Sequence, residues 1–309
     1  MKYKDWLVDW LTNYEKPSVK TRTYTKYKDV VDKRLIPTFG EYELSELTPL
    51  EVQRYIAGLS VSGNMKTGEG LAANSINSVI TVLQKSLSVA YLVGHTTSYE
   101  MNKIKRPKAE EEDVSCFTIA EQRKIEQAVM RDKREKMKGI IICLYTGLRI
   151  GELLALEWDD IDFKKGVLRV TKSCHYGKDE AGKYCRITEP PKTPKSKREI
   201  PIPKQIIPML KEMKKASTSA LVIMDGVKVP SVRAYQSSFE LLLKKNGIQH
   251  QGFHTLRHTF ATRAIECGVD VKTLSEVLGH KNATVTLNRY VHSLIEHKKA
   301  MMNKLGKLF

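Results

Sequence analysis

Two histidines stand four residues apart in the run HTLRH, residues 254–258. On a helix this spacing places both imidazoles on one face, where a pair can bind zinc. A zinc protease helix also carries a glutamate after the first histidine as general base, and here that position is Thr255. Arg257 would place a permanent positive charge beside the metal. The run therefore favours an anion that His254 and Arg257 face together, with His258 as a structural residue.

Two other segments carry residue types that can act on a phosphate. Arg149 stands in TGLRIGELLALEWDDID, and Glu152 follows one helical turn later, where its carboxylate can hold the guanidinium in place. His280 stands in VLGHKNATVTLNRYVH, with Tyr290 ten residues further on. Taken singly, an Arg–Glu pair is an ordinary surface ion pair and a tyrosine is a packed aromatic.

The ordered set Arg149, His254-x-x-Arg257, Gly-His280 and Tyr290 resembles the signature of the tyrosine recombinases, the phage integrase family. The segments TGLRIGELLALEWDDID, HTLRHTFATRAIECG and LGHKNATVTLNRYVH match the boxes of that family in order and spacing. The resemblance covers essentially the whole chain. It implies a DNA strand transferase that cleaves and rejoins DNA through a covalent 3′-phosphotyrosyl intermediate, with neither a metal ion nor ATP, and with no cofactor.

The resemblance also implies roles for the residues that contact the phosphate. Tyr290 is similar to the nucleophile, and its attack frees a 5′-hydroxyl. Arg149 and Arg257 resemble the pair that clamps the non-bridging oxygens, and His280 stands where the family bonds the same phosphate. Preorganised cations suit this chemistry because negative charge grows on those oxygens in the transition state, and losing one such donor lowers the rate about 10²–10³-fold.

The remaining roles concern protons and support. His254 resembles the residue that helps manage the tyrosine proton, and Glu152 corresponds to the acidic residue that supports the first arginine. The family protonates the leaving 5′-oxygen with a lysine on a β-hairpin, which the run PPKTPKSKREIPI at residues 190–202 resembles. Lys192 matches that position best, while Lys195 and Lys197 stand close enough to remain alternatives.

Composition agrees with a nucleic-acid partner. The chain has 309 residues and a net charge of +17, of which residues 1–110 carry +4 and residues 111–309 carry +13. Such an excess attracts polyanions. Neither a signal peptide nor a membrane span is evident, which predicts cytoplasmic residence in a bacterium, as the product of the host, a phage or a mobile element. The five cysteines are odd in number and scattered, so they indicate no disulfide framework, although Cys174 and Cys185 flank a predicted hairpin.

The elements that must position these residues fall into two domains. Residues 1–107 show helical periodicity, with Thr48 and Ser18 as helix caps and an apolar stripe from Ile76 to Tyr91, and they predict a helical core-binding, SAM-like DNA-binding domain. Residues 108–115 predict a linker. Residues 116–309 mix helices with short strands and predict the catalytic recombinase domain with a C-terminal tail. The fold class is therefore mainly α with a small antiparallel β-sheet, of the DNA breaking–rejoining type.

The expected partner is double-stranded DNA at core recombination sites. By resemblance, the basic tail after Tyr290 packs on a neighbouring protomer in a homotetramer, or alternatively it covers its own domain, and an accessory directionality factor is a further expected partner. No arm-binding domain precedes the helical bundle, so it is either absent from the protein or missing from this chain.

Other functions compete with an integrase of a mobile element. They are a Xer-type chromosome-dimer resolvase, a type IB topoisomerase that relaxes DNA, and a binding module with a helix-turn-helix in ATRAIECGVDVKTLSEVLGH. The length of the lysine hairpin, residues 171–198, favours the mobile-element integrase. The binding module leaves Arg149, Tyr290 and the lysines unexplained.

Overall fold

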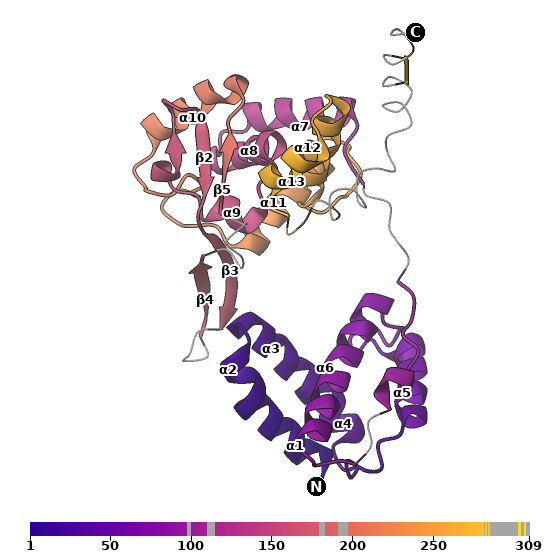
Figure 1. Cartoon of the computed structure of the whole chain (residues 1–309). Helices are drawn as coiled ribbons and strands as arrows, with labels where there is room; N and C mark the ends of the chain where they lie inside the picture. Colours follow the sequence, from indigo (N-terminus) through magenta and orange to yellow (C-terminus); the bar gives the residue numbers. More distant parts are fainter. Residues whose placement is uncertain are drawn as a thin grey trace. The chain divides into compact units, whose positions relative to one another are not determined.

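The computed structural model describes residues 1–97, 100–109, 115–178, 183–190 and 197–280, with single positions at 282, 284, 302, 303 and 306. The chain divides into two compact units, Met1–Glu112 (unit 1) and Asp113–Phe309 (unit 2), which are coloured along the sequence in Figure 1. Both units are mostly helical and small antiparallel sheets lie in unit 2, which confirms the predicted fold class. In the described parts of the chain, no helix has the length and apolar character needed to cross a membrane.

Unit 1 is a helical bundle. Its helices are α1 (Tyr3–Asp9), α2 (Lys16–Ser18), α3 (Thr21–Val30), α4 (Ile36–Phe39), α5 (Pro49–Ser62) and α6 (Ala73–Leu92), with π-helical turns at Trp10–Glu15 and Val31–Leu35 and a 3₁₀ turn at Met101–Lys103.

The core of unit 1 forms around α6. The predicted stripe is buried from Ile76 to Leu87, while Tyr91 at the end of the helix is exposed. Ser86 receives two contacts from α1, because it pairs with the Tyr3 hydroxyl at 2.7 Å and its carbonyl accepts from the Trp6 indole N–H at 3.0 Å. These bonds satisfy polar groups that the apolar core would otherwise leave without partners.

The two predicted caps of unit 1 have different outcomes. Thr48 caps α5, since its hydroxyl accepts the backbone N–H of Glu51 at 3.3 Å. The prediction that Ser18 caps the following helix is wrong, because Lys20 occupies the N-cap of α3. The Ser18 hydroxyl instead donates to the carbonyl of Tyr14, in the preceding helical segment.

Unit 2 surrounds its core with helices and strands in the following order: α7 (Ile119–Arg131), α8 (Lys138–Thr146), α9 (Ile150–Leu154), β1 (Ile161–Asp162), β2 (Val167–Val170), β3 (Ser173–Lys178), β4 (Tyr184–Glu189), β5 (Arg198–Pro201), α10 (Ile207–Ala216), α11 (Val232–Lys245), α12 (Thr255–Glu266) and α13 (Val271–Leu278). Short 3₁₀ turns lie at Glu135–Met137, Trp158–Asp160 and Lys204–Ile206. Helix α7 begins with a capping box of Thr118 and Glu121.

Helix α8 occupies the centre of unit 2. Its sequence, KGIIICLYT, is apolar around almost its whole circumference, which is typical of a helix enclosed on all sides. Residues Ile140 to Leu144 are all buried, and they belong to the same apolar core as Leu168 of β2 and Ile200 of β5. Packing on all sides therefore fixes α8, and this also fixes the position of the residues that follow Thr146.

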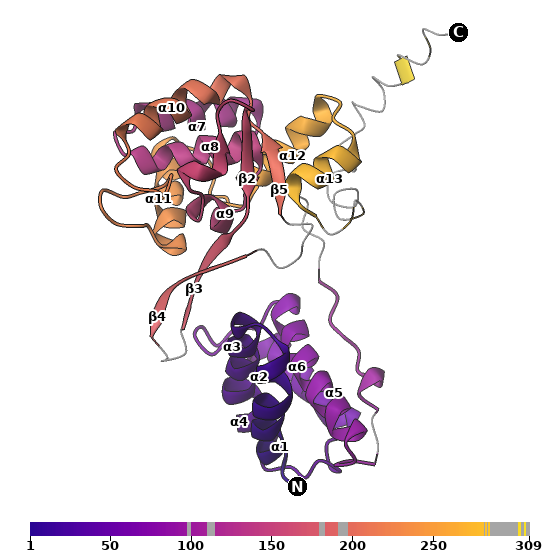
Figure 2. The same cartoon turned by 60° about the vertical axis from the view of Figure 1, so that its left-hand side comes forward.

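The strands form two antiparallel sheets. One has the order β1-β2-β5, with Leu168 opposite Ile200 and Val170 opposite Arg198. The other is the β3–β4 hairpin, which is inserted between β2 and β5 and extends beyond the helices of unit 2 in the views of Figures 1 and 2. Cys174 and Cys185 lie on this hairpin out of register with each other, and both thiols are free.

Candidate active site

Arg149 lies at the junction between two helices. Gly147 ends α8 in the left-handed conformation with φ +66°, and Arg149 then adopts an extended backbone before α9 begins. The guanidinium donates to Glu152 Oε1 at 2.9 Å and to the carbonyls of Leu278 and Gly279 at 3.3 and 3.4 Å. Because the side chain is still 37% exposed, Arg149 can also contact a bound anion.

Arg257 is buried in the first turn of α12, and its residue is 2% exposed. Its guanidinium donates to the carbonyl of Gly147 at 2.8 Å and to the carbonyl of Leu278 at 2.6 Å. These carbonyls lie at the C-terminal ends of α8 and α13, where the aligned peptide dipoles carry partial negative charge. Two helix ends therefore stabilise the buried charge of Arg257.

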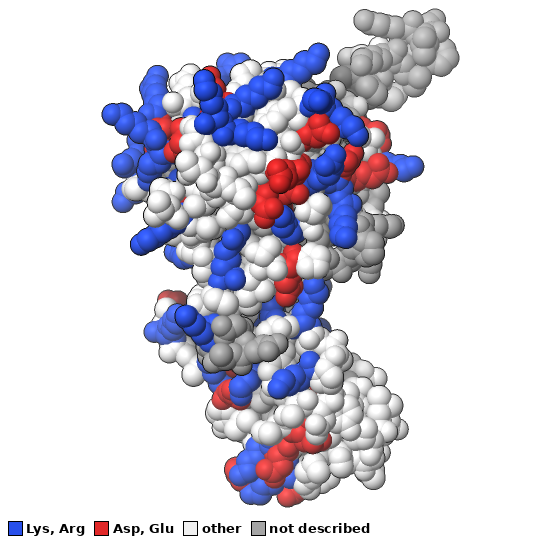
Figure 3. Space-filling model, turned by 90° about the vertical axis from the view of Figure 1, so that its left-hand side faces the viewer, with Lys and Arg blue, Asp and Glu red and all other residues white. Residues whose placement is uncertain are grey.

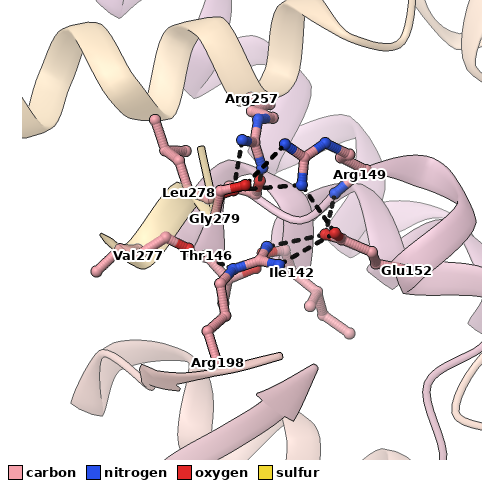
Figure 4. A network of polar contacts seen from close by, with 10 residues as sticks. Ile142, Thr146, Arg149, Glu152, Arg198, Arg257, Val277, Leu278 and Gly279 are labelled. Carbon is pink, nitrogen blue, oxygen red and sulfur yellow. Dashed lines mark hydrogen bonds and ion pairs between the residues drawn. The ribbon is translucent and has the colours of Figure 1, made fainter. Parts of the chain in front are cut away.

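Three arginines converge on the end of α13, as Figure 4 shows. The carbonyl of Val277 accepts from Arg198 Nε at 2.6 Å, while the next two carbonyls accept from Arg149 and Arg257. These carbonyls are the acceptors that a helix leaves without partners in its last turn. The C-terminal end of α13 thus sets the spacing of guanidinium groups from α9, α12 and β5.

Gly279 allows α13 to end at this point. It adopts φ +63°, its N–H donates to the carbonyl of Glu276, and the N–H of His280 donates to the carbonyl of Ser275. This pair of bonds is the Schellman motif, which terminates a helix at glycine. A Cβ at Gly279 would lie 3.0 Å from the Arg198 side chain. The chain therefore turns from α13 into His280 directly beside the arginines.

Glu152 is the carboxylate at the centre of the cluster, and its residue is 5% exposed. It accepts the backbone N–H and guanidinium of Arg149, both at 2.9 Å, and a bidentate pair of bonds from Arg198 at 3.0 and 2.9 Å. Burial raises the pKa of this carboxyl, but the hydrogen bonds and charge of Arg198 and the charge of Arg149 outweigh burial and hold the pKa at about 2. Glu152 is therefore ionised throughout the neutral range.

Arg198 is a member of the cluster that the sequence motifs did not indicate. Its side chain is 5% exposed at the start of β5. The strand pattern could have indicated this residue. Side chains alternate between the two faces of a strand, so Arg198 shares a face with Ile200 and Ile202, and both isoleucines are buried. An arginine on the buried face of a strand requires an anionic or carbonyl partner.

The two histidines of the HTLRH run pack against each other. Their ring centroids lie 4.6 Å apart with an interplanar angle of 87°, His254 is exposed, and His258 is partly buried. This is an edge-to-face contact, and the structural role of His258 stays a prediction. In the described residues, no three histidine, cysteine, aspartate or glutamate side chains gather in a way that could hold a metal ion. His280 is partly buried, immediately after Gly279.

The structure therefore brings together Arg149, Glu152, Arg257 and the backbone that leads into His280. Tyr290, Lys192 and Lys195 lie outside the described residues. Lys197 is described, and it is exposed next to Arg198 at the start of β5.

Helices α12 and α13 form a helix-turn-helix around the left-handed Gly268, as the sequence suggested. Leu274 and Leu278 pack with Ala261 and Ile265 between the two helices. The carbonyls at the end of α13 are bound by the three arginines, so this end of the helix is an integral part of the cluster.

Unit 2 presents many basic side chains. On the face of unit 2 that Figure 3 shows, Lys and Arg side chains are widely spread, with smaller groups of Asp and Glu side chains between them. The cluster contains three guanidinium groups and one carboxylate: Arg149 and Arg198 bond Glu152, while Arg257 bonds backbone carbonyls. The net positive charge favours an anion beside Arg149, whose side chain is far more exposed than that of Arg198.

Sequence comparisons identify relatives over the whole chain. The model of the phage integrase family matches residues 112–297, and that of the phage integrase N-terminal SAM-like domain matches residues 2–60. A protein of Caldanaerobacter subterraneus named tyrosine recombinase XerC-like is 32% identical, over 99% of this chain and 83% of that protein. The ICEBs1 integrase of Bacillus subtilis is 25% identical, over 94% of this chain and 78% of that protein.

Solved structures share the fold. The Tn1549 transposon integrase in complex with transposon right end DNA superposes with a TM-score of 0.82 and 21% identity, covering 99% of this chain and all of that chain. The lambda integrase tetramer bound to a Holliday junction gives a TM-score of 0.69 at 21% identity, covering 93% of this chain and 77% of that chain.

Proposed function

The chain belongs to the phage integrase family of tyrosine recombinases, and on that premise we propose that Tyr290 attacks a DNA phosphate held by Arg149 and Arg257. The observation that carries the proposal is the convergence of these two arginines on the carbonyl of Leu278. They come from separate motifs, and the acceptor lies two residues before His280, in the segment that leads to Tyr290. The arginine motifs and the start of the tyrosine-bearing segment therefore meet at one place in unit 2.

The proposed reaction proceeds in balanced steps. The Tyr290 oxygen forms a bond to phosphorus, the bond from phosphorus to the 5′-oxygen breaks, and the protein becomes attached to the 3′-phosphate. His254 accepts the tyrosine proton, since a tyrosine of pKa ~10 is mostly protonated at neutral pH. A lysine, which we assign to Lys192, protonates the leaving oxygen. Lys195 and Lys197 are the alternatives.

The arginines supply the electrostatic stabilisation. The transition state carries additional negative charge on the two non-bridging oxygens, and fixed cations stabilise it without reorganisation. Arg149, Arg257 and His280 take this role in our proposal. The covalent intermediate conserves the bond energy, so a 5′-hydroxyl from a second strand can rejoin the DNA by the reverse reaction.

We further propose that the two units have different roles, one in binding the core site and the other in catalysis. Residues 1–107 form the core-binding domain, residues 108–115 the linker and residues 116–309 the catalytic domain. The match of residues 2–60 to the SAM-like domain of phage integrases supports the first assignment. Double-stranded DNA is the substrate in this proposal, which the DNA complexes formed by the Tn1549 and lambda integrases support.

The biological role that we propose is integration and excision of a mobile element. The likeness to a transposon integrase over almost the whole of both chains and to the ICEBs1 integrase supports this role. The XerC-like relative keeps a chromosome-dimer resolvase as the alternative. An accessory directionality factor and a cytoplasmic location remain predictions.

A homotetramer is the proposed assembly, with the tail after Tyr290 packed on a neighbouring protomer, by analogy with the lambda integrase tetramer on a Holliday junction. Deleting the residues after His292 should leave covalent attachment to a single half-site and abolish the tetramer on DNA, as measured by mass photometry. Intact tetramers without the tail would contradict its proposed role.

Covalent capture tests the catalytic proposal. The protein is incubated with a library of nicked duplexes of randomised sequence, denatured, and separated from free DNA, and the DNA that remains attached is sequenced to define the site. A nicked half-site of that sequence should then give a covalent adduct with the wild type and none with Tyr290→Phe. Bound DNA without an adduct would overturn the proposed reaction, and an adduct with Tyr290→Phe would overturn the nucleophile.

A further inference from the structure

Beyond the residues that contact DNA, one buried arginine links the parts of the site. Arg198 donates to both oxygens of Glu152, which in turn holds the guanidinium and the backbone N–H of Arg149. Its Nε donates to the carbonyl of Val277. One side chain thus connects β5, α9 and α13 (Figure 4).

We propose that Arg198 is a positioning residue for DNA cleavage, acting through Glu152 and Val277. Through Glu152 it fixes Arg149, and through Val277 it fixes the end of α13 that leads into His280. The inference rests on the proposed function above, and it assigns to Arg198 no contact with DNA, since the side chain is 5% exposed.

Geometry explains why an arginine is required. The planar guanidinium directs two parallel N–H groups at a carboxylate and still has Nε available for a carbonyl on another element. A lysine carries the same charge on one nitrogen and cannot reproduce this fork. Arg198 is also the first residue of β5, so it ties the start of this strand, directly after Lys197, to the carboxylate that holds Arg149.

Loss of Arg198 should disturb Glu152 as well as Arg149. In Arg198→Met, burial still raises the pKa of the Glu152 carboxyl, while the strongest opposing contribution is gone. The carboxyl then takes up a proton at a higher pH than in the wild type, and its hold on Arg149 weakens. Other charged or titratable groups around Glu152 are the Cys143 thiol on α8, Arg257 on α12, and Asp160, Arg169 and Lys172 around the adjoining small cavity.

The experiment measures single-turnover formation of the covalent adduct on the nicked half-site. Arg198→Met should lower the rate constant about 10²-fold, the effect expected of a misplacement of about 1 Å in a catalytic group. Arg198→Lys should recover only part of this loss. Arg263→Met is the matched control, because Arg263 also bonds a carboxylate, Glu266, and a backbone carbonyl, that of Phe117, but away from the cluster. It should cleave at the wild-type rate.

Two further measurements separate positioning from a merely structural role. Binding of the half-site by Tyr290→Phe and by Tyr290→Phe/Arg198→Met should be equal, because Arg198 does not contact DNA. The ratio of the Arg198→Met rate to the wild-type rate should fall as the pH decreases from about 8 to about 5.5, and Glu152→Gln/Arg198→Met should remove this additional pH dependence.

The outcomes are distinguishable. A wild type that gives no adduct contradicts the proposed function itself. If the wild type gives an adduct and Arg198→Met cleaves equally fast, the role of Arg198 is contradicted. The role is also contradicted if Arg198→Met binds DNA more weakly by the same factor as its cleavage is slowed. If Arg198→Met does not fold, Arg198→Lys decides: a folded lysine variant with the wild-type rate overturns the inference, and a folded but slow one supports it.

Discussion

Arg149 and Arg257 donate to the same acceptor, the carbonyl oxygen of Leu278, at 3.3 and 2.6 Å. A shared backbone acceptor sets the separation of the two guanidinium groups by the position of α13, rather than by the rotamers of two long side chains. Preorganisation of this kind matters because a donor contributes to the rate only if it is already in place when charge develops. Both arginines should therefore be sensitive to changes at the ends of α8 and α13.

Replacing Arg257 should impair both catalysis and stability. Arg257→Met removes a donor to the phosphate in our proposal, so adduct formation should slow about 10²–10³-fold. It also removes the guanidinium from the carbonyl of Gly147 and leaves the carbonyl of Leu278 with the longer bond from Arg149, which should cost about 1–3 kcal/mol of unfolding free energy. Single-turnover kinetics and urea unfolding measure the two effects. If the folded variant forms the adduct at the wild-type rate, Arg257 does not bind the phosphate during cleavage.

Gly147 should tolerate no side chain. Gly147→Ala places a Cβ 2.5 Å from Phe260 in a left-handed backbone, so both overpacking and backbone strain should destabilise the protein, by about 1–3 kcal/mol for the overpacking and about 1 kcal/mol for the strain. Cleavage should slow as well, because the Gly147 carbonyl binds Arg257.

Gly166→Ala is the control for this change. Gly166 has the same φ of +66°, but nothing lies within 4 Å of the place that its Cβ would take, so only the strain should appear. Equal stability losses in the two variants, measured by urea unfolding, would show that contact with Phe260 has no influence.

The stability contribution of Glu152 should depend on pH. Its pKa is lowered from 4.5 to about 2, so the contribution is fully present above about pH 4.5 and is lost as the pH falls towards 2. At neutral pH this amounts to roughly 3 kcal/mol. The difference in unfolding free energy between the wild type and Glu152→Gln should therefore be constant near neutrality and shrink in acid. Hydrogen exchange of α8 and α9 peptides measures it, and a difference that grows in acid would contradict the assignment.

The catalytic lysine can be identified with a DNA substrate whose leaving group does not need to be protonated. Alanine variants of Lys192, Lys195 and Lys197 are compared on a normal half-site and on one with sulfur in place of the bridging 5′-oxygen. A thiol leaving group has a pKa of about 8.5 and needs no general acid. Lys192→Ala should be slow on the normal DNA and restored on the sulfur analogue, whereas the other two variants should cleave both normally. If the sulfur analogue instead restores cleavage by the Lys195 or Lys197 variant, that lysine is the general acid.

DNA affinity should fall steeply with salt. The net charge of +17 implies many phosphate contacts, each of which releases counterions, so the logarithm of the binding constant should decrease linearly with the logarithm of salt concentration. Titrations of Tyr290→Phe on the half-site at several salt concentrations measure the slope. A shallow slope would mean that apolar contacts dominate binding.

Much of this protein could be predicted from its sequence, because the relevant signals are local. The helix cap Thr48 and the apolar stripe that begins at Ile76 act over a few residues, and they indicated a helical first unit. The order of Arg149, His254, Arg257, His280 and Tyr290 indicated the family. Ser18 shows the limit of such signals, since a hydroxyl near a helix boundary can bond within the preceding helical segment instead of capping the next helix.

Only the tertiary structure decided how the motifs meet. Nothing in the spacing of Arg149 and Arg257 indicates a common acceptor, because that acceptor is a backbone carbonyl, and every residue has one. Nor does the sequence motif single out Arg198, whose importance comes from being buried opposite Glu152 when β5 pairs with β2. Local propensity determines which elements form, whereas the partners of a buried charge depend on which elements pack together.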